Sequence, residues 1–138
     1  MPYDTLPALS AVYLEDSYVL DVVTGDQSVE LELDLVLTEQ HPAYREPRRS
    51  DQYCYRRACI SIDNPMSVHW IRRTMRPFRD VTGDVDYGSI DVWRTEGNVN
   101  HIEGDWGELE IIGGQVRVIL ETDEEEAERS QDGHDGPT

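Results

Sequence analysis

The stretch that decides the fold is residues 29–37, which read Val29-Glu30-Leu31-Glu32-Leu33-Asp34-Leu35-Val36-Leu37. Apolar and acidic side chains alternate along most of this stretch, so its hydrophobic pattern has a period of two. Successive side chains of a β-strand point to opposite faces of a sheet. The pattern therefore predicts a strand with one apolar face against a core and one acidic face in water.

The neighbouring sequence extends this strand into a sheet. Residues 18–23 are rich in β-forming side chains, and the turn signal Thr24-Gly25-Asp26-Gln27 separates them from residues 29–37. These two segments are predicted to pair as a hairpin. Residues 53–62 predict a central strand, whose inward-facing side chains are expected to be Ala58, Ile60 and Ile62.

Two further pairs of segments are separated by glycine-containing turns. Residues 89–94 and 98–103 are predicted to pair through Glu96-Gly97. Residues 108–112 and 115–120 flank Gly113-Gly114. Two glycines suit a two-residue primed turn because both tolerate positive φ, so this last pair is also predicted to be a hairpin.

The segment 67–78 is ambiguous between a helix and a strand. Val68, Ile71, Met75 and Phe78 fall on one helical stripe, whereas Val68 and Trp70 alternate as they would in a strand. Pro77 blocks a long helix, which favours a short strand over 67–72 followed by an irregular segment. The expected fold class is all-β, with allowance for one short helix. The expected architecture is an antiparallel β-sandwich or strongly curved sheet of seven to eight strands.

The 138 residues suit a single β-rich domain, expected over residues 1–122. Residues 123–138 contain one alanine as their only apolar side chain, alongside seven acidic residues. Such a segment cannot bury enough surface to offset its ordering entropy. It is therefore expected to be a disordered acidic C-terminal tail.

Composition excludes several classes of protein. No lysine occurs, which rules out a lysine catalyst and a Walker-type phosphate loop, and no apolar run is long enough to span a membrane. The N-terminus has no basic or long apolar region of the kind found in secretory signals, so a cytoplasmic location is expected. Cys54 and Cys59 are five residues apart and would face opposite sides of one strand, so both are expected to be reduced.

The strongest overall signal is acidity. The chain has 29 acidic and 12 basic residues, for a formal net charge of −17, which argues against a surface that binds nucleic acid throughout. We expect a non-catalytic interaction domain that binds a basic partner protein. Its size, acidity and β-rich pattern are of the kind seen in inhibitor and immunity-type proteins. The candidate acidic face consists of Glu30, Glu32, Asp34, Glu108 and Glu110.

The acidity also has an explanation that involves no partner. A chain rich in Asp and Glu and without Lys is consistent with a bacterial or archaeal source that is salt-adapted or has a GC-rich genome. In that case the surface charge serves solubility.

A second hypothesis is a small-ligand-binding protein or a hydrolase. His101 and Glu103 lie two residues apart and would share one face of a strand, where an imidazole and a carboxylate can act as acid and base. The full candidate set is Asp84, Asp86, His101, Glu103, Asp105 and Trp106. The chain lacks His-Glu-x-x-His, Cys-x-x-Cys and His-x-His, so neither a metal nor a cofactor is predicted.

An arginine cluster lies in the middle of this acidic chain. Residues 45–80 hold nine arginines and four acidic residues, with aromatic side chains between them. Because guanidinium groups suit phosphate and carboxylate, a local site for an anion or a nucleic-acid end is conceivable, formed by Arg45, Arg48, Arg49, Arg72 and Arg73. The alternative is that the arginines pair internally with the acidic strands. Arg56 and Arg57 point to opposite faces of their strand, so one of them is expected to pair across the sheet.

Overall fold

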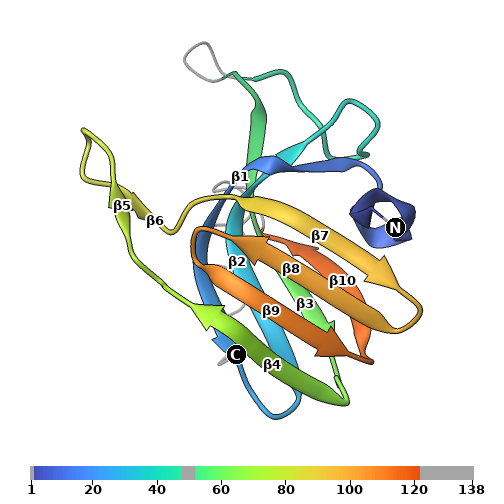
Figure 1. Ribbon diagram of the computed structural model, residues 1–138. Helices are drawn as coiled ribbons and strands as arrows, with labels where there is room; N and C mark the ends of the chain where they lie inside the picture. The colour runs from blue at the N-terminus through green and yellow to red at the C-terminus, as the bar shows by residue number, and fades with distance from the viewer. Residues whose placement is uncertain (1, 48–51, 122–138) are drawn as a thin grey trace, which may run out of the picture.

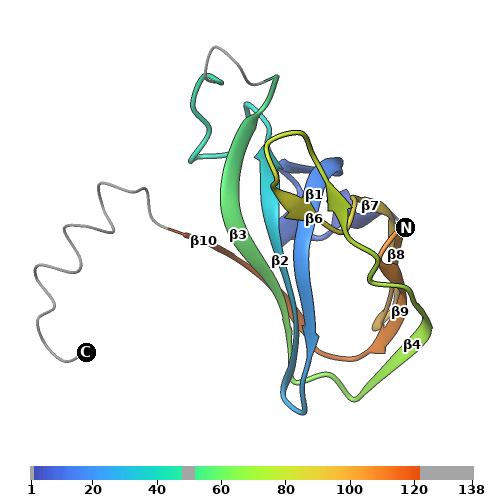
Figure 2. The same cartoon turned by 90° about the vertical axis from the view of Figure 1, so that its left-hand side faces the viewer.

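A computed structural model describes residues 2–47 and 52–121 as an all-β protein. Within these residues two four-stranded antiparallel sheets form two layers (Figures 1 and 2). The first sheet has the order β1 (Val12–Thr24), β2 (Ser28–Leu37), β3 (Cys54–Asp63) and β10 (Gln115–Leu120). The second has the order β4 (Ser67–Arg73), β9 (Gly107–Ile112), β8 (Val99–Gly104) and β7 (Ile90–Glu96). The predicted fold class is confirmed.

The remaining elements are short. A two-stranded ribbon of β5 (Phe78–Arg79) and β6 (Val85–Asp86) projects from one end of the sandwich (Figure 1). The described residues contain two 3₁₀ turns, η1 (Tyr3–Thr5) and η2 (Pro7–Leu9), and no α-helix. No helix in the described part of the chain is long and apolar enough to cross a membrane. The predicted acidic tail, residues 123–138, lies outside the described residues.

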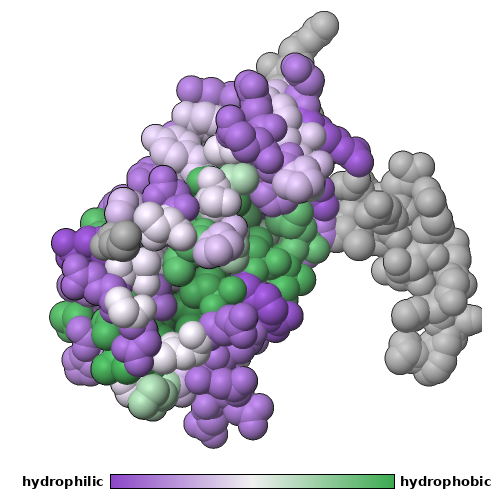
Figure 3. Space-filling model, turned by 90° about the vertical axis from the view of Figure 1, so that its right-hand side faces the viewer, coloured by the Kyte–Doolittle hydropathy of each residue, from purple (hydrophilic) through white to green (hydrophobic). Residues whose placement is uncertain are grey.

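The core forms between the two sheets, and the alternation in β2 supplies much of it. Leu31, Leu33 and Leu35 are fully buried, and Ile102 and Leu109 of the second sheet belong to the same buried cluster. Each such side chain contributes about 1.5–3 kcal/mol by leaving water. Val116, Val118 and Leu120 of the edge strand β10 are partly buried and pack against this core. Figure 3 shows an apolar area among hydrophilic residues on one face of the molecule.

Most of the predicted strand pairs are present. β1 pairs with β2, β7 pairs with β8, and β3 lies between β2 and β10 as a central strand. Ala58, Ile60 and Ile62 of β3 are buried, as predicted. The ambiguous segment 67–72 is a strand, because β4 pairs with β9 along its length.

The predicted hairpin around Gly113-Gly114 is wrong. β9 pairs with β8 and β4, whereas β10 pairs with β3 in the other sheet, so the two glycines carry the chain from one sheet to the other. Both glycines have positive φ, at 76° and 94°. A Cβ on Gly114 would lie 2.9 Å from the carbonyl oxygen of Asp63, so the corner is also too tight for a side chain. Positive φ is needed equally in a hairpin and in this corner, which is why the glycines alone could not distinguish them.

Candidate functional site

The residues proposed as one acidic face lie on two different surfaces. Glu30, Glu32 and Asp34 occupy the outward face of β2, in the first sheet. Glu108 and Glu110 occupy the outward face of β9, in the second sheet. Because the apolar faces of the two sheets pack together, these two acidic groups point away from each other on opposite sides of the sandwich.

The acidic row on β2 is partly neutralised by an arginine from β3. Arg57 Nε donates to Asp34 Oδ1 at 3.1 Å, and its Nη1 lies 3.8 Å from Glu32 Oε1. The hydrogen bond to Asp34 raises the pKa of Arg57. This is the cross-sheet pairing that the sequence predicted for one of the two adjacent arginines. Glu30, farther along the same row, forms no ion pair with any described residue.

The described members of the proposed anion-binding arginine set make contacts within the fold. Arg72 donates through Nη2 to the Gly104 carbonyl at 3.1 Å and through Nη1 to Thr74 Oγ1 at 2.9 Å. The guanidinium of Arg73 lies over the Trp70 ring, 4.8 Å from its centroid. Arg48 and Arg49 lie outside the described residues, and Arg45 has its own interaction partner. These contacts favour the internal role of the arginines.

The second candidate set is only partly brought together. Trp106 is fully buried in the core and presents no surface to a ligand. Asp84 is exposed on the loop leading to β6, and Asp86 Oδ1 accepts a hydrogen bond from the Gly88 amide at 2.8 Å. Asp105 lies at the corner between β8 and β9, close to Gly88. The pair that stays together is His101 and Glu103, on the outward face of β8.

His101 and Glu103 gain a third neighbour that the sequence analysis had assigned elsewhere. The β8–β9 register places Glu103 directly opposite Glu108. His101 Nε2 lies 3.0 Å from Glu108 Oε2 and 4.0 Å from Glu103 Oε1. The three side chains are partly exposed, at 22%, 39% and 22% for His101, Glu103 and Glu108. An imidazole and two carboxylates thus converge on a solvent-accessible point.

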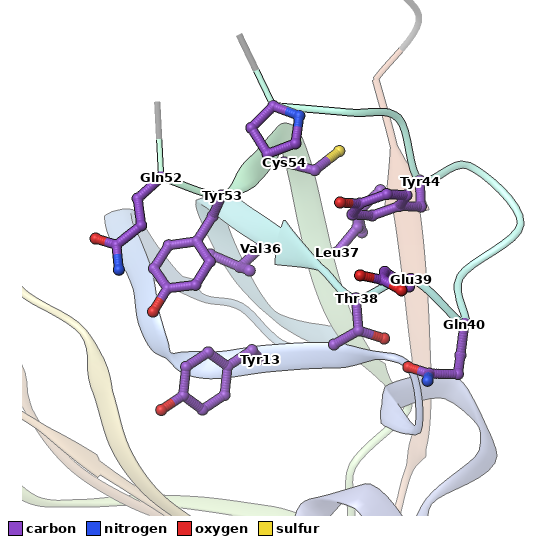
Figure 4. A pocket seen from close by; sticks show the side chains of 11 residues that line it. Tyr13, Val36, Leu37, Thr38, Glu39, Gln40, Tyr44, Gln52, Tyr53 and Cys54 are labelled. Atoms are coloured by element: carbon purple, nitrogen blue, oxygen red, sulfur yellow. The ribbon is translucent and has the colours of Figure 1, made fainter. Parts of the chain in front are cut away.

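A tyrosine-lined pocket lies at one end of the first sheet, and the sequence analysis did not identify it. Its volume is about 520 Å³, within the size range of small-molecule sites. Figure 4 shows side chains from β1, the end of β2, the following loop and the start of β3 around it. The lining residues are Tyr13, Val36, Leu37, Thr38, Glu39, Gln40, Tyr44, Pro47, Gln52, Tyr53 and Cys54.

Two of the tyrosines at this pocket, Tyr13 and Tyr53, belong to a larger aromatic cluster. Tyr13 and Tyr53 pack edge to face with ring centroids 6.1 Å apart, and Tyr53 also contacts Tyr55, which stacks on Tyr18 at 6.0 Å. The Tyr53 hydroxyl donates to Asp16 Oδ2 at 2.6 Å. These contacts hold the rings of Tyr13 and Tyr53 in place.

The pocket has an electronegative lining. The hydrogen bond to Asp16 and partial burial raise the pKa of Tyr53. Partial burial and the nearby carboxylates of Glu39 and Glu46 raise the pKa of Tyr44. Neutral phenol rings and a carboxylate therefore line the cavity. The one signal for it in the sequence was the long loop after residue 37, which is unusual in a compact domain and suggests a binding role.

Comparison with known proteins adds no assignment. No protein-family model, curated protein or solved structure matches this chain. Its function therefore has to be inferred from its own side chains.

Proposed function

We propose that this protein is a non-catalytic binding module that captures a basic partner protein, and that a cationic side chain of the partner enters the tyrosine-lined pocket. The observation that carries the proposal is the lining of that pocket, in which Tyr13, Tyr44 and Tyr53 surround a cavity together with Glu39. Aromatic faces attract guanidinium and ammonium groups through their negative quadrupole. A carboxylate adds a charge-assisted hydrogen bond.

The acidic row on β2 leads to this pocket. Glu30, Glu32 and Asp34 alternate along the outward face of β2, and the next outward residue, Val36, lines the pocket. Neighbours in such a row are about 6.6 Å apart. An extended basic segment lying along β2 could therefore place one side chain in the pocket while others meet the row.

The net charge of −17 supports the same choice of partner. A strongly charged surface speeds the encounter with an oppositely charged protein and repels other acidic molecules. Long-range attraction alone provides no specific contact. The pocket adds a rigid aromatic anchor of the kind that dominates binding energy at interfaces. An inhibitor or immunity-type protein that binds a basic enzyme is one function of this class.

The proposal is tested with a small probe of the cationic side chain. The ¹H–¹⁵N spectrum of the full chain is titrated with N-acetyl-arginine methylamide and, separately, with the citrulline analogue, which has the same shape without the charge. We expect the arginine probe to shift the amides around the pocket, including Tyr13, Thr38 and Tyr44. We expect the citrulline probe to leave them in place.

Matched substitutions separate the pocket from general charge. Glu39→Gln removes a carboxylate at the pocket, and Glu110→Gln removes one from the opposite sheet. We expect Glu39→Gln to weaken the arginine probe about 10-fold, which corresponds to ~1.4 kcal/mol. Glu110→Gln should change its affinity by less than about two-fold, because salt screens charges on the far side. Equal effects of the two substitutions, or equal binding of the citrulline probe, would reject the pocket as the recognition site.

A further inference from the structure

A second binding site is suggested by the outward face of the other sheet, where His101, Glu103 and Glu108 converge. Their ligand atoms all lie within 4.8 Å of one another. Tetrahedral coordination with bonds of about 2.0–2.1 Å separates neighbouring ligand atoms by about 3.3 Å. The observed distances of 3.0 Å and 4.0 Å from His101 Nε2 bracket that value. Small rotamer adjustments therefore bring the three atoms to one ion.

The backbone holds these donors in place. Glu103 and Glu108 are directly opposite each other in the β8–β9 register, and the pairing continues to Gly104 and Gly107 at the corner. Directly beneath, Ile102 and Leu109 face each other and are fully buried. All three donors therefore stand on strands anchored in the core, which makes their spacing more reproducible than it would be on a loop.

The two carboxylates of this cluster favour the binding of a cation. Like charges directly opposite each other in a sheet are destabilising. Glu103 and Glu108 occupy such a pair of positions, and the group between them is the imidazole of His101. Arg72, which is opposite Glu108 in β4, directs its guanidinium to the Gly104 carbonyl and Thr74. A divalent ion at the centre would remove the repulsion between the two carboxylates.

We propose that His101, Glu103 and Glu108 bind Zn²⁺. One nitrogen and two carboxylate oxygens suit zinc, whereas Mg²⁺ and Ca²⁺ prefer oxygen ligands alone. Three protein ligands leave a coordination position open. A hollow of about 470 Å³ lined by Arg94, Glu96, Val99 and His101 adjoins the donors. It has room for a water or a small anionic ligand at the open position.

This site is independent of the proposed partner-binding pocket, since the two lie on different sheets. Ion and pocket occupancy are therefore distinguishable by location.

The test is calorimetric titration of the chelator-treated full chain with ZnCl₂. We expect one ion per chain, and a loss of affinity of at least about 100-fold in His101→Ala and in Glu108→Gln. His69→Ala and Glu30→Gln are matched controls that make the same kinds of change away from the three donors, because His69 lies on β4, two strands from His101, and Glu30 lies on the other sheet. Both controls should bind within about two-fold of the parent chain.

A spectroscopic measurement keeps the test independent of affinity alone. Co²⁺ in a site with few ligands gives intense visible absorption, whereas Co²⁺ held loosely by surface carboxylates stays six-coordinate and pale. The parent chain should give the intense band and His101→Ala should not, while circular dichroism shows that the variant is folded. Absence of one-to-one zinc binding, or binding that persists in the folded His101→Ala variant, would overturn the proposal. Persistent binding would place the ion elsewhere, for example among other surface carboxylates.

Discussion

One buried hydrogen bond allows the packing of the second sheet to be tested quantitatively. Trp93 Nε1 donates to Asn100 Oδ1 at 2.9 Å, and the two residues are 2% and 6% exposed. Trp93 lies on β7 and Asn100 on β8, so the bond links these strands on the core side of the sheet, opposite the outward face that presents His101. We predict that Asn100→Leu, which removes the acceptor and keeps a similar volume, destabilises the protein.

The magnitude follows from the burial of the orphaned group. A buried donor that loses its partner costs about 1–3 kcal/mol. Two other buried indole groups, those of Trp70 and Trp106, already have no hydrogen-bond partner among the described residues. The hydrogen bond to Asn100 is the only one that the Trp93 indole makes among the described residues. For a chain of this size the cost lowers the Tm by about 3–12 °C.

Thermal and urea unfolding followed by far-ultraviolet circular dichroism measure the effect in two backgrounds. In the parent background Asn100→Leu should show the full cost. In a Trp93→Phe background the donor is absent, so the same substitution should cost at least about 1 kcal/mol less. If Asn100→Leu costs the same in both backgrounds, the hydrogen bond is not the source of the loss and the reasoning fails.

Three further predictions concern other parts of the fold. Leu33→Ala, at a fully buried position, should cost about 2–5 kcal/mol in urea unfolding, and a cost below about 1 kcal/mol would mean that β2 does not form the core. Burial and the neighbouring Tyr18 raise the pKa of Tyr55 to about 12, so absorbance at 295 nm should show a late tyrosine titration that Tyr55→Phe removes. Because the folded-state value is raised above about 10, the associated stability is complete below that pH and is lost as the pH rises towards 12. Burial and the carboxylates of Glu30 and Glu32 raise the pKa of the Cys59 thiol, so a thiol reagent should modify it more slowly than free cysteine at neutral pH, and Glu32→Gln should speed that reaction.

The parts of the fold that the sequence predicts are those whose signal is local. The alternation in residues 29–37 is set by which side chains face the core, and the same period appears in the strands that pair with it. The sheet change at Gly113-Gly114 was missed because the turn residues report backbone conformation and not the destination of the chain. That destination depends on where β3 and β8 offer an unpaired edge, which is a property of the assembled sheets.

The candidate sites, like the fold, could be predicted from the sequence only where the signal is local. The spacing of His101 and Glu103 placed them correctly on one strand face, but Glu108 joins them only through the β8–β9 register. The pocket depends on pairings such as Tyr13 with Val36 and Leu37 with Cys54, which join segments more than fifteen residues apart. The period of two in the sequence predicts that the acidic side chains point outward. It does not predict that they lie on two opposite faces of the sandwich, because that depends on which strands belong to which sheet.

Because the two acidic groups lie on opposite faces, the salt dependence of binding distinguishes the two proposed binding activities. Capture of a basic partner along β2 relies on attraction between exposed charges, which salt screens over about 8 Å at physiological ionic strength. Zinc coordination by His101, Glu103 and Glu108 relies on direct bonds at about 2 Å, well inside that screening length. The arginine probe should therefore lose most of its affinity at about 0.5 M salt while zinc affinity changes far less. If both fall together, the outward face of the second sheet attracts cations only by its charge, and the three donors do not form a coordination site.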